Sequence, residues 1–293
     1  MTNAQDQGLV LKNYSGFYYV QNAQGKISEC RIRGKLKERI LSGDRVAFTP
    51  LAEDKGIIEQ VLPRDNEMFR PRIANVSMVL IVMAYDRPLP SPMLLDRLLL
   101  LVRYGGLKPV IVFNKADLPI NQAVKGIMDY YPRIGLPLLS VSARYRQGMD
   151  ELSSVINGEI AVLAGPSGVG KSSILNLLTG QDAVPTQEVS NKIGRGRHTT
   201  RHVELYPLDN NGWLADTPGF SVLDLPRMPR EQLPALFEDF VEYADDCKFA
   251  DCLHYKENDC GVKDAVKANK ILPSRYENYL SILAEVIENE RCY

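Results

Sequence analysis

No apolar run in this 293-residue chain is long enough to form a transmembrane helix, and the longest stretches, such as residues 76–84, fit buried strands. No N-terminal segment resembles a signal peptide, so we expect a cytoplasmic protein without a membrane partner. Excess charge is also lacking: 35 Lys and Arg residues stand against 36 Asp and Glu residues. This balance excludes a general attraction to nucleic acid, so any RNA contact must come from local patches.

Cysteine is scarce, yet three of the five copies lie close together with a histidine between them: Cys247, Cys252, His254 and Cys260. Three sulfurs and one imidazole can close tetrahedrally around a single structural Zn²⁺ ion. A disulfide or unconnected buried thiols are the alternatives, and the expected reducing compartment disfavours the disulfide. Cys30 and Cys292 lie far from this cluster, and we expect each to be a free thiol.

A glycine-rich loop of the form G-x-x-x-x-G-K-S is the clearest motif, and it consists of Gly165, Pro166, Ser167, Gly168, Val169, Gly170, Lys171 and Ser172. We expect a strand before it, over 160–164, and a helix after it, over 172–179. Backbone N–H groups of such a loop surround phosphate oxygens at the positive end of the helix. Lys171 would contact the β- and γ-phosphates, Ser172 would coordinate Mg²⁺, and Ser173 would also contact the nucleotide.

The base of that nucleotide is indicated by Asn114, Lys115 and Asp117, which form the sequence N-K-x-D after a strand expected over 110–113. Polar residues at the carboxyl end of a strand lie where open α/β sheets bind ligands. The Asp117 carboxylate can accept from both the ring N–H and the amino group of guanine, a pattern that adenine lacks. A second expected strand, over 138–141, leads to Ser142 and Ala143, which resemble the loop that supports the base with a backbone amide.

Two later segments complete the expected phosphate site. Asp216 and Gly219 belong to a D-x-x-G sequence, in which the carboxylate would hold Mg²⁺ through water and the Gly219 N–H would meet the γ-phosphate. The Gly- and Arg-rich residues 191–201 are predicted to be a segment that nucleotide orders. Within it, we prefer Thr200 over Thr199 as a Mg²⁺ ligand. The alternative for this segment is a solvated basic loop.

The order of these elements is unusual, because the N-K-x-D sequence precedes the phosphate loop by about fifty residues. In an ordinary GTPase it follows that loop, so the chain resembles a circularly permuted GTPase. Permutation preserves the folded site, because a compact domain tolerates new termini at exposed loops. It also joins the D-x-x-G segment directly to the C-terminal region, so we expect motion of that segment to act on this region.

The first sixty residues show the pattern of a small β-barrel, with short and often alternating runs at 8–20, 27–33, 45–49 and 56–62. The OB-fold is the commonest such barrel in nucleic-acid proteins. Basic residues alternate along one segment and aromatic residues lie near it in sequence: Arg31, Arg33, Lys35, Lys37 and Arg39, then Tyr14, Phe17, Tyr18 and Tyr19. This combination favours RNA binding. A solvated strand edge with the aromatic rings in the core explains the pattern equally well.

The C-terminal region has apolar residues at helical spacing over 230–243 and 274–290. We therefore expect an α/β protein with three domains and a linker between the first two. These are an OB-like barrel over 1–63, a linker over 64–72, a circularly permuted P-loop GTPase domain over 73–225 and a helical zinc-binding domain over 226–293.

With these parts in series, the chain resembles the ribosome small-subunit-dependent GTPase A (RsgA) family, also called YjeQ or YloQ. The resemblance covers essentially the whole sequence and is most specific in the N-K-x-D, phosphate-loop, 196–200, D-x-x-G and cysteine motifs. It implies a bacterial cytoplasmic factor that binds the small ribosomal subunit and its rRNA late in maturation. Such a factor hydrolyses GTP to GDP under stimulation by the subunit and then leaves. We expect a monomer.

The hydrolytic chemistry has one gap, because Phe220 stands directly after Gly219, where many GTPases have a water-orienting glutamine. His198 is the best internal candidate for polarising water, and the resembling family suggests the same role. Lys171 and Thr200 are the other two residues that we expect to be catalytic, through the phosphates and Mg²⁺. The alternative is that His198 contacts RNA or solvent. Two other functions stay open: a nucleotide-gated RNA-binding switch with incidental hydrolysis, and a zinc-stapled P-loop ATPase.

Overall fold

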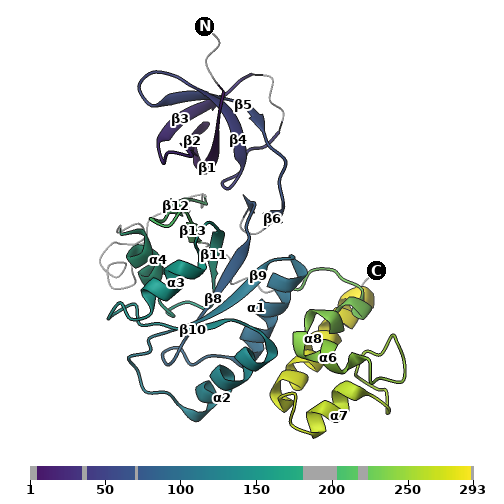
Figure 1. Cartoon of the computed structure of the whole chain (residues 1–293). Coiled ribbons are helices and arrows are strands. Elements are labelled where there is room, and N and C mark those ends of the chain that lie inside the picture. Colours follow the sequence, from purple (N-terminus) through teal and green to yellow (C-terminus); the bar gives the residue numbers. More distant parts are fainter. Residues whose placement is uncertain (1–4, 35–37, 70–71, 181–202, 217–223, 292–293) are drawn as a thin grey trace. The chain divides into compact units, whose positions relative to one another are not determined.

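The computed structural model describes residues 5–34, 38–69, 72–180, 203–216 and 224–291 (Figure 1). The chain divides into two compact units, and each is described by itself. One unit consists of residues 1–80, 146–164 and 170–221, and the other consists of residues 81–145, 165–169 and 222–293. The expected fold class is confirmed: a closed barrel is followed by a mixed sheet with helices and by a helical C-terminal region.

The barrel belongs to the first unit and has the strand order β1-β2-β3-β5-β4. Its strands are β1 (Asp6–Tyr14), β2 (Phe17–Asn22), β3 (Ile27–Ile32), β4 (Arg45–Pro50) and β5 (Lys55–Val61). Among the described residues, the buried side chains of its core cluster are Val10, Val20, Cys30, Ile40, Val46, Phe48 and Ile58. The apolar run expected over 8–20 is two strands, because Ser15 and Gly16 both take positive φ and close a tight hairpin between them.

The segment that the sequence indicated as a linker, residues 64–72, overlaps a short hairpin of β6 (Glu67–Phe69) and β7 (Arg72–Ala74). Before the hairpin, the guanidinium of Arg64 donates to the buried Asp44 carboxylate at 2.6 Å. At the last residue of the hairpin, the Ala74 carbonyl lies so close to Gly43 that a Cβ added to Gly43 would stand 2.1 Å from the carbonyl oxygen. These contacts hold the hairpin against the turn before β4.

The second sheet has the strand order β10-β9-β8-β11-β13-β12. Its strands are β8 (Met78–Ala84), β9 (Lys108–Asn114), β10 (Leu138–Ser140), β11 (Ile160–Ala164), β12 (Leu205–Pro207) and β13 (Trp213–Asp216). Strands β9 and β10 are parallel, as are β11 and β13, whereas β12 pairs antiparallel with β13. Every residue of β8 is buried, as expected for a strand covered on both faces.

Of the helices within the described residues, α3 (Met149–Val155) and α4 (Lys171–Thr179) lie in the first unit and the others lie in the second. These are α1 (Pro92–Tyr104), α2 (Gln122–Tyr130), α6 (Glu238–Ala244), α7 (Gly261–Lys267) and α8 (Pro273–Arg291), with short 3₁₀ helices η1 (Tyr131–Ile134), η2 (Arg230–Gln232) and η3 (Pro234–Leu236). Ser91 begins α1 by accepting the Leu94 N–H. Within the described residues, no helix combines the length and the apolar character that crossing a membrane requires.

The C-terminal region differs from the expected pair of helices at its start. The segment expected to be helical over 230–243 begins as η2 and η3, and an α-helix forms only from Glu238. Pro234 is one physical reason, because it lacks the N–H that a continuous helix would use there. Helices α6, α7 and α8 gather beside α1 (Figure 1), and Leu100 of α1 belongs to the same buried cluster as Phe237, Phe240 and Tyr279.

Candidate functional site

Asn114, the last residue of β9, connects the two loops on either side of it. Its side-chain amide donates to the Val169 carbonyl at 2.8 Å and its side-chain oxygen accepts the Ala143 N–H at 3.0 Å. The side chain is only 2% exposed, so both bonds are shielded from water. The buried asparagine thereby fixes the glycine-rich loop, through Val169, to the loop that contains Ala143.

The Asp117 carboxylate is oriented by Ser142, whose hydroxyl donates to Asp117 Oδ1 at 2.6 Å. Ser142 is fully buried and Asp117 is exposed, so the buried hydroxyl fixes one side of a carboxylate that faces solvent. The sequence assigned Ser142 a backbone role, and its side-chain contact was missed. Lys115 takes a positive φ of 64°, and its ammonium donates to the Arg87 carbonyl.

The phosphate loop requires glycine for two different reasons. An added Cβ at Gly165 would lie 2.1 Å from the Val82 carbonyl oxygen, so the loop passes directly over β8. Gly168 and Gly170 take positive φ of 83° and 96°, which side chains rarely adopt. Helix α4 then begins at Lys171, so the positive end of the helix follows the loop directly, as in sites that bind anions.

Several predicted site residues lie outside the described part of the chain: Lys35, Lys37, His198, Thr199, Thr200, Gly219 and Phe220, with Cys292 among the free thiols. Asp216 ends β13, where its backbone pairs with Leu163, and its side chain is likewise outside the description. The predicted roles of these residues stay predictions.

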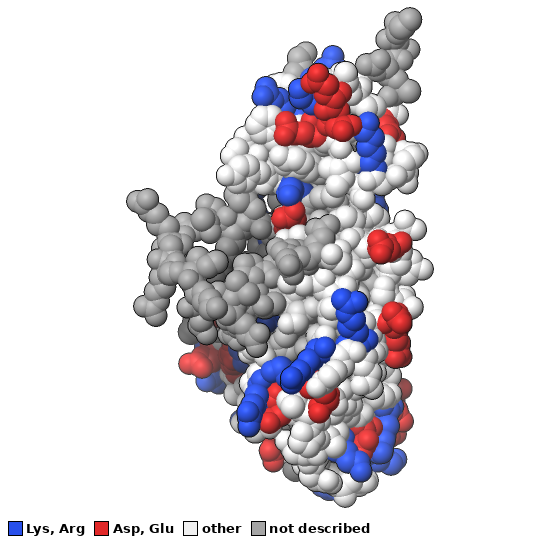
Figure 2. Space-filling model, turned by 90° about the vertical axis from the view of Figure 1, so that its left-hand side faces the viewer, with Lys and Arg blue, Asp and Glu red and all other residues white. Residues whose placement is uncertain are grey.

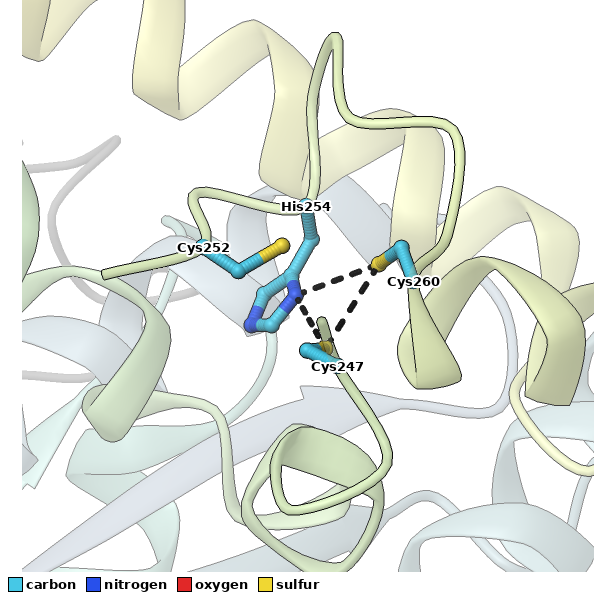
Figure 3. Close-up of side chains that lie close together, drawn as sticks. All are labelled: Cys247, Cys252, His254 and Cys260. Carbon is cyan, nitrogen blue, oxygen red and sulfur yellow. Dashed lines mark hydrogen bonds between the residues drawn. The ribbon is translucent and has the colours of Figure 1, made fainter. Parts of the chain in front are cut away.

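The four predicted zinc ligands come together near the C-terminus, with one ligand atom of each within 4.8 Å of the others (Figure 3). The Cys247 and Cys260 sulfurs are 3.8 Å apart, and His254 Nδ1 lies 3.6 Å from the first and 3.4 Å from the second. Zn–S bonds of about 2.3 Å and Zn–N bonds of about 2.05 Å give tetrahedral edges of about 3.8 and 3.6 Å. The donor set and its spacing therefore fit Zn²⁺.

The loop that carries these ligands is held by two tyrosine hydroxyls whose role no local sequence pattern indicates. The hydroxyls of Tyr276 and Tyr279 on α8 donate to the carbonyls of His254 and Leu253, at 2.7 and 2.6 Å. Burial lowers the pKa of His254, which favours the neutral imidazole that a metal binds. Burial raises the pKa of Cys252 to about 12, so a nearby cation is needed to favour its thiolate.

The sequence left open whether the aromatic residues near the basic segment face outward or fill the barrel core. In the structure, most of them lie on the outer face of the β1–β2 hairpin. Lys12 pairs with Tyr19 and Tyr14 pairs with Phe17, so these four side chains share one face. Tyr14 is 63% exposed, and the Arg31 guanidinium lies 4.6 Å from the centre of the Phe17 ring. A further residue, Tyr18, packs against the barrel core instead.

The other predicted RNA-binding residues in the described part are exposed, but one of them has an acidic partner. Arg33 donates to Glu59 at 3.0 Å, whereas the carbonyl of Arg39 accepts from Arg64. On the face drawn in Figure 2, basic and acidic side chains are interspersed. That face therefore has small groups of charged side chains of both signs, in keeping with the net charge of −1.

Comparisons with known proteins agree with this geometry. The family model for the RsgA GTPase matches residues 61–226, and the model for the RsgA N-terminal domain matches residues 7–58. A protein of Carboxydothermus hydrogenoformans named "Small ribosomal subunit biogenesis GTPase RsgA" is 47% identical over 289 residues, covering 97% of this chain and 99% of the relative.

Two solved structures are similar over nearly the whole chain. YjeQ from Thermotoga maritima has a TM-score of 0.82 at 34% identity, covering 97% of this chain and 99% of its own. YloQ, described as a circularly permuted GTPase, has a TM-score of 0.82 at 33% identity, covering 98% of this chain and 96% of its own.

Proposed function

Since the chain belongs to the RsgA GTPase family, we propose that it binds the small ribosomal subunit late in maturation and hydrolyses GTP under stimulation by that subunit. The observation that supports the nucleotide part is the Ser142–Asp117 hydrogen bond, which would orient the Asp117 carboxylate for contact with the edge of guanine. The products would be GDP and phosphate. We also propose that the protein acts as a monomer in the cytoplasm.

The phosphate end of GTP would be bound by the loop that leads into α4. Lys171 would offset the charge of the β- and γ-phosphates, while the loop N–H groups hold their oxygens. Ser172, Thr200 and Asp216 offer the oxygen ligands that Mg²⁺ prefers, and the ion would neutralise charge on the leaving phosphate. His198 would polarise the attacking water, because Phe220 cannot.

Zinc would have a structural role in this function. The Cys247, Cys252, His254 and Cys260 loop connects α6 to α7, and tyrosines of α8 hold its backbone. A metal at this point would fix the loop between α6 and α7 and the backbone that α8 contacts. The charge of the ion would also stabilise the thiolates that burial disfavours.

Coupling between nucleotide and subunit would pass through the segment after Gly219. Leu225 and Met228, which follow that segment, are buried in the cluster that includes Phe240 and Tyr279. Contact of the γ-phosphate with Gly219 would therefore bias the helical region, and linkage makes the effect reciprocal. We expect subunit affinity to be higher with a GTP analogue than with GDP by about 1 to 3 kcal/mol.

Co-sedimentation with purified small subunits, in GDP and in a non-hydrolysable GTP analogue, tests the proposal together with GTP hydrolysis measured with and without subunits. Lys171→Ala should abolish hydrolysis under both conditions, whereas Lys125→Ala, an exposed change on α2, should not. His198→Ala should lose most stimulated turnover and keep analogue-dependent binding. Equal subunit affinity in both nucleotides would contradict the coupling, and absence of stimulation would contradict the function.

Two alternative functions make different predictions in these assays. A nucleotide-gated RNA-binding switch would bind subunits in a nucleotide-dependent manner without faster hydrolysis. A zinc-stapled ATPase would favour adenine nucleotides, which the Asn114 and Asp117 arrangement argues against. Competition between GTP and ATP for the free protein separates this last function from the proposed one.

A further inference from the structure

A cavity of about 270 Å³ lies on the outside of the barrel and is lined by Lys12, Asn13, Tyr14, Tyr19 and Glu204. The first four residues lie on the β1–β2 hairpin, and Glu204 comes from the segment just before β12. All five belong to the same compact unit. The cavity therefore combines one cation and two aromatic rings of the barrel with a carboxylate from elsewhere in the chain.

Lys12 is the cation of this cavity, and Glu204 binds it. The ammonium lies 2.6 Å from Glu204 Oε1 and 5.2 Å from the centre of the Tyr19 ring. The two charged side chains retain 39% and 35% of their exposure, so water and other anions can reach the pair. An ion pair this exposed contributes little to stability and is open to competition.

The residues around Lys12 suit one particular competitor. Tyr14, Phe17 and Tyr19 present three rings on the same outer face, with Arg31 over the middle ring. Stacked aromatic rings beside spaced cations bind single-stranded RNA, because bases stack on the rings while phosphates contact the cations. The Glu204 carboxylate contacts the Lys12 ammonium, which a phosphate oxygen would otherwise contact.

We propose that Glu204 is an intramolecular competitor of RNA, whose carboxylate holds the Lys12 ammonium until a phosphate of single-stranded RNA displaces it. The proposal deepens the proposed function, on which it rests for RNA as the partner. RNA bound on this face removes the Lys12 contact from Glu204. The neighbouring contact, from the Ser42 hydroxyl to the Val203 carbonyl at 2.7 Å, involves no charge and does not compete with phosphate.

The test measures binding of a fluorescein-labelled oligouridylate of about twelve nucleotides to the zinc-loaded full chain, by fluorescence anisotropy. Glu204→Gln should lower the Kd at least about threefold, because the neutral amide releases Lys12. Lys12→Met should raise the Kd and reduce its salt dependence by about one counterion. When Glu204→Gln is added to Lys12→Met, the Kd should not change further, because the cation that Glu204 holds is already absent.

A matched control separates this competition from a general loss of negative charge. Glu53→Gln makes the same change on the barrel, at a carboxylate that pairs with the exposed Lys55 at 3.0 Å. Equal tightening by Glu53→Gln and Glu204→Gln would overturn the proposal, as would tightening by Glu204→Gln that persists without Lys12.

A second control checks that the barrel contacts stay intact in the Glu204→Gln protein. Trp213 is the single tryptophan, and its indole N–H donates to Gln21 of β2 at 2.9 Å. Its emission should be the same in Glu204→Gln and in the unchanged protein. Absence of RNA binding in every variant would overturn the proposal while leaving subunit-stimulated hydrolysis, measured separately, to decide the proposed function.

Discussion

Arg275 of α8 and Asp96 of α1 form a buried ion pair of 2.5 Å, in which the side chains are 2% and 0% exposed. The same guanidinium donates to Asp239 of α6 at 2.8 Å, and Asp96 also accepts from Tyr131 and Asn278. One buried cation thus connects three helices, and its carboxylate partners have further donors. The helices around the cysteine cluster and α1 consequently share a polar core as well as an apolar one.

Replacing Arg275 should reveal the cost of leaving these carboxylates unpaired. We expect Arg275→Met to lower the free energy of unfolding by about 3 to 5 kcal/mol, because breaking a buried pair strands a buried charge. Arg97→Met is the matched control: it removes another α1–α8 pair, with Glu285, that remains partly exposed. That change should cost about 1 kcal/mol or less. Equal losses in urea unfolding would contradict the importance assigned to burial.

The hairpin after the barrel yields a steric prediction. Gly43 and Gly25 both take positive φ, at 90° and 80°, but only Gly43 faces the backbone of Ala74. Gly25→Ala should therefore cost about 1 kcal/mol of stability for its dihedral angle alone. Gly43→Ala should cost at least about 2 kcal/mol more, because the hairpin must move. Thermal unfolding of the two variants measures the difference, and similar melting temperatures would argue against a close fit.

Asp117→Asn should shift the base preference from guanosine toward xanthosine nucleotides, because the amide presents a donor where guanine needs an acceptor. Losing two charge-assisted hydrogen bonds should cost about 3 kcal/mol or more in GTP affinity. Asp129→Asn, the same change at an exposed site on α2, should leave binding unaltered. Titration with GTP and XTP measures both. Unchanged GTP binding in Asp117→Asn would remove the base-reading assignment.

Ser142→Ala separates orientation from recognition at the same site. The variant keeps the Asp117 carboxylate and loses the 2.6 Å bond that orients it. We expect weaker GTP binding, by about 1 to 2 kcal/mol, with guanine still preferred over xanthine. A switch of base preference in this variant would mean that Ser142 itself contacts the base.

Zinc content distinguishes the cysteine cluster from the isolated thiol. Cys252→Ala should reduce zinc below one equivalent and loosen the helical region, while GTP binding persists in part. Cys30→Ala is the control, since Cys30 is buried in the barrel, where burial raises its pKa to about 12. Elemental analysis of protein purified without chelator provides the measurement. Absence of metal in the unchanged protein would refute the zinc site.

The sequence by itself determined the elements whose chemistry is local. The phosphate loop depends on backbone dihedrals at Gly168 and Gly170, and those requirements appear directly as residue types. The strands β8, β9 and β11 follow from short apolar runs, and the cysteine cluster follows from close spacing. In each case the interacting groups lie within a few residues of one another, so pattern and structure coincide.

Only the tertiary structure decided the contacts between distant segments. Arg275 and Asp96 are 179 positions apart, Lys12 and Glu204 are 192 apart, and no periodicity connects either pair. The role of the Ser142 hydroxyl and the outward position of Tyr14 likewise depend on how strands pair and loops close. Such contacts are fixed by packing of whole elements, which leaves no local signature in the residues that make them.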